Sequence, residues 1–515
     1  QEAAFAEVDG LELPGLVKIY LAGLTKLDVA ISRLVEFLLV KYRDVDRGLA
    51  ANALGQVGSE KAIKKLIPLL QDSDWRVRES AVDALGKIGS KTAIEKLIPL
   101  LKTSYSDVGG RAAEVLGQIG AEIGSETTIK KLILLLKESY FSSFSVNVSK
   151  RAAEVLGKIG SETVIEHLIP LLKDSYSDVR GRAAEVLGQI GSETAIEELI
   201  LLLQDSNSYV RGRAAEALGK IGSETVIEQL IPLLKDSYSD VRGRAAEALG
   251  KIGSEKVIEQ LIPLLKDSYF DVRGRAAEAL GQIGSEKVIE QLIPLLKDSY
   301  SDVRGRAAEA LGQIVSETVI ERLIPLLQDS DSSVRMSAAE ALGQIGSETG
   351  IEGLIPLLQD SDSSVRMSAT EALGQIGSET VVEQLIPLLQ DSDFNVRRSA
   401  AYALGRIASE TAIEGLIPLL QDSNSYMRIG VASALGQIGS ETVIEQLIPL
   451  LQDSDSGVRW SIAEALGQIG SETGIEGLIP LLQDSDSSVG RSAAKVLCKI
   501  GSENTIIELT KKLQN

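Results

Sequence analysis

Two arginines, one residue apart, recur along the chain and have the chemistry to hold an anion. In EQLIPLLKDSYSDVRGRAAEALG, residues 228–250, Arg242 and Arg244 follow an acidic turn that contains Asp236. Guanidinium groups bind phosphate and carboxylate through paired hydrogen bonds, so such a cluster could be an anion site. Near-copies of the same stretch, however, return at a constant interval along the chain. The role of the arginines therefore has to be derived from the repeat that carries them.

Prolines inside an apolar segment set the length of the repeat. The interval is 31 residues once Leu134 and Leu201 are placed in two of the slots and insertions at 120–126 and 139–150 are allowed. The prolines are Pro68, Pro99, Pro170, Pro232, Pro263, Pro294, Pro325, Pro356, Pro387, Pro418, Pro449 and Pro480. A fixed period of this length is the signature of stacked structural repeats. We expect fifteen repeats in one solenoid over residues 31–515, closed by a half repeat. Residues 1–30 fit the pattern poorly and are expected to form an N-terminal cap or junction.

Each repeat is predicted to be a pair of α-helices. In the first helix, Thr225 and Glu228 have the spacing of a capping box, and Pro232 lies deep enough to kink the helix. In the second helix, alanines on the buried face permit close packing, and Gly253 is expected to end the helix in the left-handed conformation. Neither helix can bury its apolar face alone, so neighbouring repeats must stack. The fold class is all-α, a right-handed α–α superhelix.

These motifs resemble HEAT repeats, specifically the short type named after phycobilisome lyases. The resemblance rests on the proline of the first helix, the Asp six residues before the Arg of VR, and the VRxxAAxALGxIG second helix, and it covers residues 31–515. It implies that second helices line a concave face on which partners bind. The function it favours is a non-catalytic protein–protein scaffold or recognition arm. The alternatives are a phycobilin lyase or lyase partner subunit, and a nucleic-acid-binding HEAT-like protein.

The first arginine of each pair is interpreted as structural, because it recurs in eleven of the fifteen repeats. We expect it to bond the aspartate of its own turn and the turn of the adjoining repeat. The resemblance to HEAT repeats implies a row of hydrogen bonds between repeats at these positions. The residues predicted to form this first row are Asp174, Arg180, Asp205, Arg211, Asp236 and Arg242.

The second arginine of each pair is the better candidate for function. It is expected to face outward on the second helix, with a glutamate three residues later as its partner: Arg182, Arg213, Arg244, Arg275 and Arg306. This second row is either a solvated series of charges or a zwitterionic binding groove. After Arg306 the slot becomes mostly serine, and the slot before it becomes Met336, Met367, Arg398, Ile429 and Trp460, with Tyr402 in a glutamate slot. We hypothesise a partner-binding patch there; the alternative is neutral drift on a tolerant surface.

Composition narrows the classes of function. The net charge of −20 opposes nucleic-acid binding, and a single Cys498 and a single His167 leave no disulfide framework and no histidine-based metal cluster. No apolar run is long enough to span a membrane, and no export signal is recognisable. We expect a cytoplasmic protein without cofactor, metal or catalytic residues, whose partner is another protein. The turn tyrosines, such as Tyr238 and Tyr300, are expected to pack against neighbouring turns.

Overall fold

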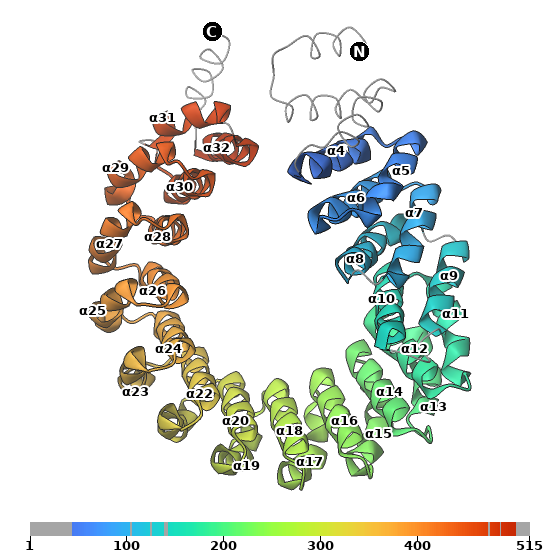
Figure 1. The fold of residues 1–515 in the computed structure, drawn as a ribbon. Coiled ribbons are helices and arrows are strands. Elements are labelled where there is room, and N and C mark those ends of the chain that lie inside the picture. The colour runs from blue at the N-terminus through green and yellow to red at the C-terminus, as the bar shows by residue number, and fades with distance from the viewer. Residues whose placement is uncertain are drawn as a thin grey trace. The chain divides into compact units, whose positions relative to one another are not determined.

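The computed structural model describes residues 44–103, 106–123, 126–137, 143–471, 474–484 and 486–500. The predicted cap at 1–30 and the terminal half repeat lie outside these residues. Every regular element within the described ranges is helical. The chain divides into two compact units, unit 1 up to Ile252 and unit 2 from Gly253 onward. Both are rows of helix pairs (Figure 1), as the fixed period of the sequence predicts.

In unit 1 the second helices of the repeats pack side by side as one layer: α4 (Asp44–Val57), α6 (Trp75–Ile88), α8 (Ser106–Ile123), α10 (Ser143–Ile159), α12 (Ser177–Ile190), α14 (Ser208–Ile221) and α16 (Ser239–Ile252). The first helices form the other layer: α5 (Glu60–Leu66), α7 (Lys91–Leu97), α9 (Glu126–Lys137), α11 (Glu162–Leu168), α13 (Ile196–Leu202) and α15 (Ile227–Leu230). Leucines, isoleucines and alanines from both layers are buried between them. The core is therefore continuous from repeat to repeat.

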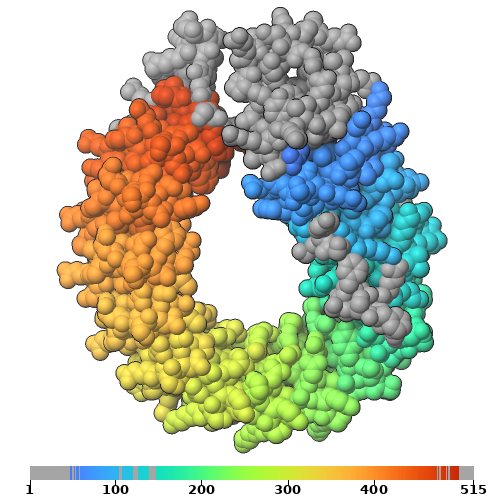
Figure 2. Space-filling model, viewed as in Figure 1, coloured from blue at the N-terminus to red at the C-terminus, as the bar shows by residue number. Residues whose placement is uncertain are grey.

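Unit 2 repeats this arrangement. Its second helices are α18 (Phe270–Ile283), α20 (Ser301–Ile314), α22 (Ser332–Ile345), α24 (Ser363–Ile376), α26 (Phe394–Ile407), α28 (Ser425–Ile438), α30 (Ser456–Ile469) and α32 (Ser487–Ile500). Its first helices are α17 (Ile258–Leu261), α19 (Ile289–Leu292), α21 (Ile320–Leu323), α23 (Ile351–Leu354), α25 (Val382–Leu385), α27 (Glu410–Leu416), α29 (Ile444–Leu447) and α31 (Ile475–Leu478). The space-filling view shows the repeats of each unit packed into a continuous body (Figure 2).

Proline does more to the first helix than the predicted kink. In the repeat of Pro232, the α-helix ends at Leu230 and a 3₁₀ segment, η6 (Ile231–Lys235), follows with the proline in its first turn. Proline has no N–H to donate and its ring clashes with the carbonyl four residues back, so α-helical bonding stops there. Where Leu134 takes the proline slot, α9 runs unbroken for 12 residues. The expectation of a kinked α-helix is therefore wrong: the helix changes type.

The predicted capping box is also wrong. The helix containing Thr225 begins at Glu224 after Ser223, whose hydroxyl lies 2.8 Å from the hydroxyl of Thr225 and makes no bond to a backbone N–H. Other repeats do use the serine, since Ser409 accepts a hydrogen bond of 3.1 Å from the backbone N–H of Ala412. The serine, one residue before the glutamate, is thus the N-cap position in both cases.

Glycines have two separate roles in the second helix. Gly253 has a φ of 74°, the left-handed end that the sequence predicted. The glycine of the LG pair allows successive second helices to approach closely: a Cβ added to Gly281 would lie 2.6 Å from the Cα of Ala310. The LG pair, which served only as a landmark in the sequence, is therefore a contact between repeats.

The two insertions lengthen second helices. Residues 120–123 extend α8 to 18 residues, and α10, which begins within the second insertion, has 17 residues where most second helices have 14. Tyr140 and Phe141 of the second insertion lie outside the described residues.

Candidate protein-binding surface

The first arginine row joins each repeat to the next. Arg211 donates from Nε and Nη2 to both carboxylate oxygens of Asp236, at 2.8 and 2.9 Å, and from Nη1 to the backbone carbonyl of Asp205 at 2.8 Å. Arg180 does the same toward Asp205 and the carbonyl of Asp174. The aspartate of the same turn thus offers its carbonyl, while the carboxylate partner belongs to the following repeat. Both expected contacts are therefore made: the aspartate of the same turn is bonded through its backbone carbonyl, and the turn of the adjoining repeat through its carboxylate.

Each carboxylate of this row is also held by a backbone amide. Burial raises the pKa of Asp236, but hydrogen bonds from Arg211 and from the backbone N–H of Tyr238, 2.9 Å away, lower it more, so the pKa lies below its ordinary value. Arg242 donates to the carbonyl of Asp236 at 2.8 Å. The turn tyrosines lie against this row, since the ring of Tyr238 is centred 5.7 Å from the guanidinium of Arg211. These groups are engaged in joining repeats.

The second arginine row makes different contacts from those expected. Arg213 does pair with the glutamate three residues on, Glu216, at 3.1 Å. Arg244 instead reaches back to Glu216 of the preceding repeat and to Asp240, one helical turn earlier. In unit 2, Arg306 likewise bonds Glu278 of the preceding repeat and Asp302.

The two remaining arginines of the second row are Arg275 and Arg182. Arg275 pairs with Asp271 at 3.1 Å, four residues back, and Arg182 is half-buried, with its Nε buried and without a hydrogen-bond partner among the described residues. The expected i,i+3 pair is therefore made by Arg213, whereas Arg244 and Arg306 bond other carboxylates. Long arginine side chains reach the glutamate of the neighbouring second helix because those helices lie so close together. Arg244 and Arg306 of the second row therefore also join repeats.

Serine takes over the same connection where the arginines stop. The hydroxyls of Ser337, Ser368 and Ser399 donate to the glutamate of the preceding repeat, Glu309, Glu340 and Glu371, at 2.7, 3.1 and 2.8 Å. These serines are buried, with exposed fractions of 8%, 3% and 4%. The change from arginine to serine thus preserves a hydrogen bond between repeats while removing a positive charge.

The residues of the hypothesised patch are accessible at the surface of unit 2. Tyr402 is 37% exposed and Trp460 is 43% exposed, Arg398 is exposed, and Met336, Met367 and Ile429 are half-buried. All six lie on the second helices from α22 to α30. The guanidinium of Arg398 lies 5.9 Å from the ring centre of Phe394. These residues form a strip along one layer of unit 2, which we call the second-helix strip.

At Tyr402 the connection between repeats is lost. In the following repeat the serine position holds Gly430, which has no side chain to donate, and one repeat further on Ser461 donates to the backbone carbonyl of Ile429 at 3.1 Å instead. Tyr402 and Gly430 therefore occupy both ends of a connection that neighbouring repeats make with glutamate and serine. The ring of Tyr402 therefore occupies a position where no serine is available to bond a glutamate.

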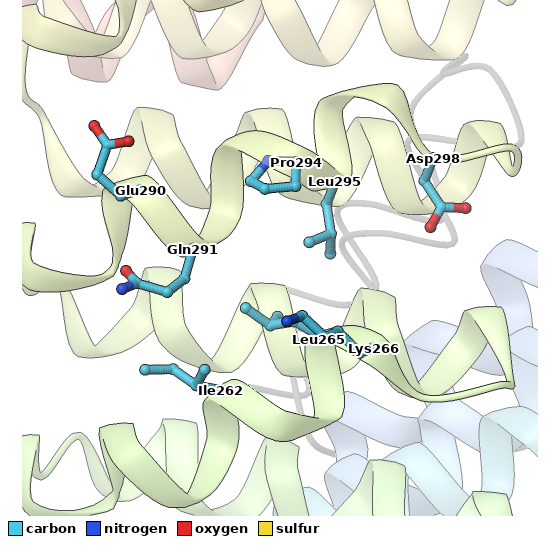
Figure 3. Close-up of a pocket in the computed structure, with 8 residues that line it drawn as sticks. All are labelled: Ile262, Leu265, Lys266, Glu290, Gln291, Pro294, Leu295 and Asp298. Carbon is cyan, nitrogen blue, oxygen red and sulfur yellow. The ribbon is translucent and has the colours of Figure 1, made fainter.

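Shallow hollows lie on the other layer, between successive first helices. One in unit 2, about 320 Å³, is lined by Ile262 and Leu265 of one repeat and by Gln291, Pro294 and Leu295 of the next (Figure 3). A hollow of about 300 Å³ occurs in unit 1 with Ile200, Pro232 and Leu233 in its lining, two repeats earlier. The lining is built from the proline segments that recur in most repeats. The unit 2 hollow is also lined by Lys266, Glu290 and Asp298, and such hollows follow from the packing of first helices.

The described residues contain no cluster of His, Cys, Asp and Glu that could hold a metal ion. His167 is half-buried, and its Nδ1 lies 2.8 Å from the carbonyl of Thr163 in its own helix. No helix in the described ranges is both long and apolar enough to cross a membrane.

Stacked helix pairs with hydrogen-bonded connections between repeats define an α-solenoid. The model of HEAT repeats matches residues 31–117, 107–185, 165–250, 227–311, 289–373, 351–429, 413–498 and 447–515. The chain belongs to the HEAT-repeat family. No curated protein sequence matches it.

Solved structures with the same fold include importin-β. Yeast importin-β (Kap95p) is 15% identical with a TM-score of 0.57, and the match covers 94% of this chain and 78% of that one. Importin-β in an ammonium sulfate condition is 14% identical with a TM-score of 0.54, covering 92% and 79%. A complex of Kap95 with Nup1 gives 14% identity and a TM-score of 0.53, covering 94% and 78%. At this identity the likeness shows the HEAT solenoid fold.

Proposed function

We propose that the chain is a non-catalytic scaffold that binds a partner protein through the second-helix strip of unit 2. The observation that carries the proposal is the exposure of Tyr402 and Trp460 on helices whose other exposed positions hold polar or charged residues. Methionine and aromatic side chains are enriched in the cores of protein interfaces, and the largest contributions to binding come from tryptophan and tyrosine. The stacked repeats hold these side chains in one row, and the side chains provide the apolar contact area.

The structural similarity supports the proposal only as an example of what the fold permits. One of the similar structures is a complex of Kap95 with another protein, Nup1. The two alternatives from the sequence, a phycobilin lyase and a nucleic-acid-binding protein, have no contact or charge cluster in the described residues that favours them. The short repeat type named after phycobilisome lyases stays a prediction from the repeat motif alone.

The proposal is tested by changing Met336, Tyr402 and Trp460 together to alanine. Partner proteins captured by the wild-type chain are first identified by affinity purification and mass spectrometry. The triple variant should then lose capture of those proteins while its melting temperature changes little, because none of the three side chains is fully buried.

The matched control changes exposed apolar side chains on first helices of unit 1. Leu134 and Leu201 are 61% and 63% exposed on first helices, and their replacement by alanine should leave capture intact. Equal capture by the wild-type chain and the Met336, Tyr402 and Trp460 variant would contradict the proposal.

A further inference from the structure

The charge of unit 2 changes abruptly between two adjacent pairs of repeats. Residues 255–316 contain ten acidic and eight basic residues, whereas residues 317–378 contain ten acidic and three basic residues, all three of them Arg. The number of acidic residues is kept, although Asp271 and Asp302 become serine while Asp331 and Asp362 replace tyrosine. Three cations are lost in each repeat: a lysine of the first helix, a lysine of the turn and the second-row arginine become threonine, glutamine and serine. Basic residues nearly balance the acidic ones in 255–316, whereas most acidic residues in 317–378 have no basic counterpart.

The second helices show where the uncompensated carboxylates lie. Glu309, Glu340 and Glu371 are exposed and occupy equivalent positions on α20, α22 and α24, one repeat apart. The serines that donate to them are neutral. Of the three arginines in 317–378, Arg335 and Arg366 are bonded to Asp360 and Asp391 in the first row.

The carboxylates of this column act on one another. Partial burial raises the pKa of Glu340 above its ordinary value, the hydroxyl of Ser368 opposes this, and the negative charges of Glu309 and Glu371 raise it further. A cation from outside the chain would relieve this repulsion.

Apolar side chains lie beside these carboxylates. Met336 and Met367 come four residues before Glu340 and Glu371, so each methionine shares a helix face with its glutamate. Tyr402 follows in the glutamate slot of the next second helix, α26. We call the face formed by Glu309, Met336, Glu340, Met367, Glu371 and Tyr402 the acidic methionine face. It is an uncovered helix layer that combines apolar contact area with three carboxylates; the exposed cation Arg398 lies at its end, four residues before Tyr402 on α26.

We infer that the acidic methionine face binds a basic, extended segment of a partner protein, whose Lys or Arg residues pair with successive glutamates while apolar side chains contact the methionines and Tyr402. The inference rests on the proposed function and names the chemistry of the partner. Charge complementarity selects a cationic segment over an acidic one or a second copy of this chain, whose net charge is −20.

The spacing of the repeats suggests the spacing of the cations. Packed helices lie about 8–10 Å apart, and a polyproline II segment advances about 9.3 Å over three residues. A cation at every third residue of such a segment would therefore meet one glutamate per repeat. The methionines, with flexible and polarizable side chains, can adapt to different apolar residues between the cations.

The test uses the full chain and a fluorescent peptide of four Lys-Pro-Leu units, measured by anisotropy. We expect binding that weakens as salt rises, and no binding of the matched Glu-Pro-Leu peptide. Glu340→Gln with Glu371→Gln should weaken binding by about tenfold, because glutamine keeps an acceptor for the serine but removes both charges. Ser337→Arg with Ser368→Arg should do the same, since arginine occupies this slot in the preceding repeats. Glu278→Gln, beside Arg306, is the control and should bind as the wild type does.

Some outcomes would overturn the inference. These are equal binding of the lysine and glutamate peptides, no binding of either, or unchanged affinity in the Glu340→Gln, Glu371→Gln variant. If that variant also captures the identified partner normally, while the Met336, Tyr402 and Trp460 variant does not, the proposed function stands and the basic partner is excluded. If neither variant affects capture, the proposed function fails as well.

Discussion

Removing one arginine of the first row should loosen the two repeats that it joins. Arg304 donates from Nε and Nη2 to Asp329 at 2.7 and 2.8 Å, and from Nη1 to the carbonyl of Asp298 at 2.9 Å. Both paired side chains are 14% exposed. In Arg304→Ala, the carboxylate of Asp329 keeps the backbone N–H of Asp331 but loses its cation. Removing one partner of a mostly buried pair costs about 3 kcal/mol.

The loss should be local, because each repeat of a solenoid contacts only its neighbours. Native-state hydrogen exchange measures it directly. Protected amides of α20 and α22 should exchange roughly a hundredfold faster, the equivalent of about 3 kcal/mol, while those of α28 and α30 keep their rates. Arg322→Ala, which removes an exposed arginine of a first helix, is the control and should change stability by less than about 0.5 kcal/mol.

The effect should also depend on pH. Hydrogen bonds from Arg304, the largest cause, hold the pKa of Asp329 below its ordinary value. A carboxyl with a lowered pKa in the folded state stabilises the fold above its unfolded pKa of about 3.9, and this contribution is lost as pH falls through the folded pKa. The wild type and Arg304→Ala should therefore differ by a constant amount from pH 5 to 8 and converge below pH 4. Unchanged exchange in α20 and α22, or an equal increase in every helix, would refute the role assigned to this row.

Single positions of unit 2 give three further predictions. Val315 has a φ of 54° where most repeats have glycine, so Val315→Gly should stabilise the fold by about 1 kcal/mol in chemical denaturation, and no gain would show that the valine is unstrained. Gly281→Ala should destabilise by about 1–3 kcal/mol, because its Cβ would lie 2.6 Å from the Cα of Ala310, and a neutral result would show that α18 and α20 can separate without cost. The pKa of Glu340 is raised in the folded state, so its protonated form stabilises the fold below about pH 4, and this stabilisation is lost as pH rises through the folded pKa. Glu340→Gln should therefore raise the melting temperature at pH 7 but not at pH 4.

The sequence predicts the helix pairs well because each element is specified locally. Apolar spacing, the serine–glutamate start and the terminal glycine recur in nearly every copy, so Gly253 and its equivalents could be assigned from one repeat. The behaviour of proline was harder to predict. Removing one hydrogen bond can bend a helix or change its type, and only the surrounding backbone decides between these results.

The side-chain connections could not be derived from a single repeat. Arg211 has Asp205 6 residues before it and Asp236 25 residues after it. Which carboxylate it bonds depends on the distance between successive turns, and that distance is set by how the repeats stack. For the same reason the second-row arginines were assigned to glutamates of their own helix. The sequence separation of Ser337 and Glu309 was a visible signal, since it equals that of Arg306 and Glu278. The candidate strip was predicted from residue types, and the structure adds its exposure and the missing connection at Tyr402.

The central claim is that partner proteins contact the second-helix strip of unit 2, and site-specific photo-crosslinking tests it most directly. A photoreactive amino acid replaces Tyr402 in one variant and Leu201, on a first helix of unit 1, in another, in cells that produce the protein. The account predicts a discrete crosslinked partner from position 402 and none from position 201. Crosslinks from position 201 alone, or the same products from both positions, would contradict it.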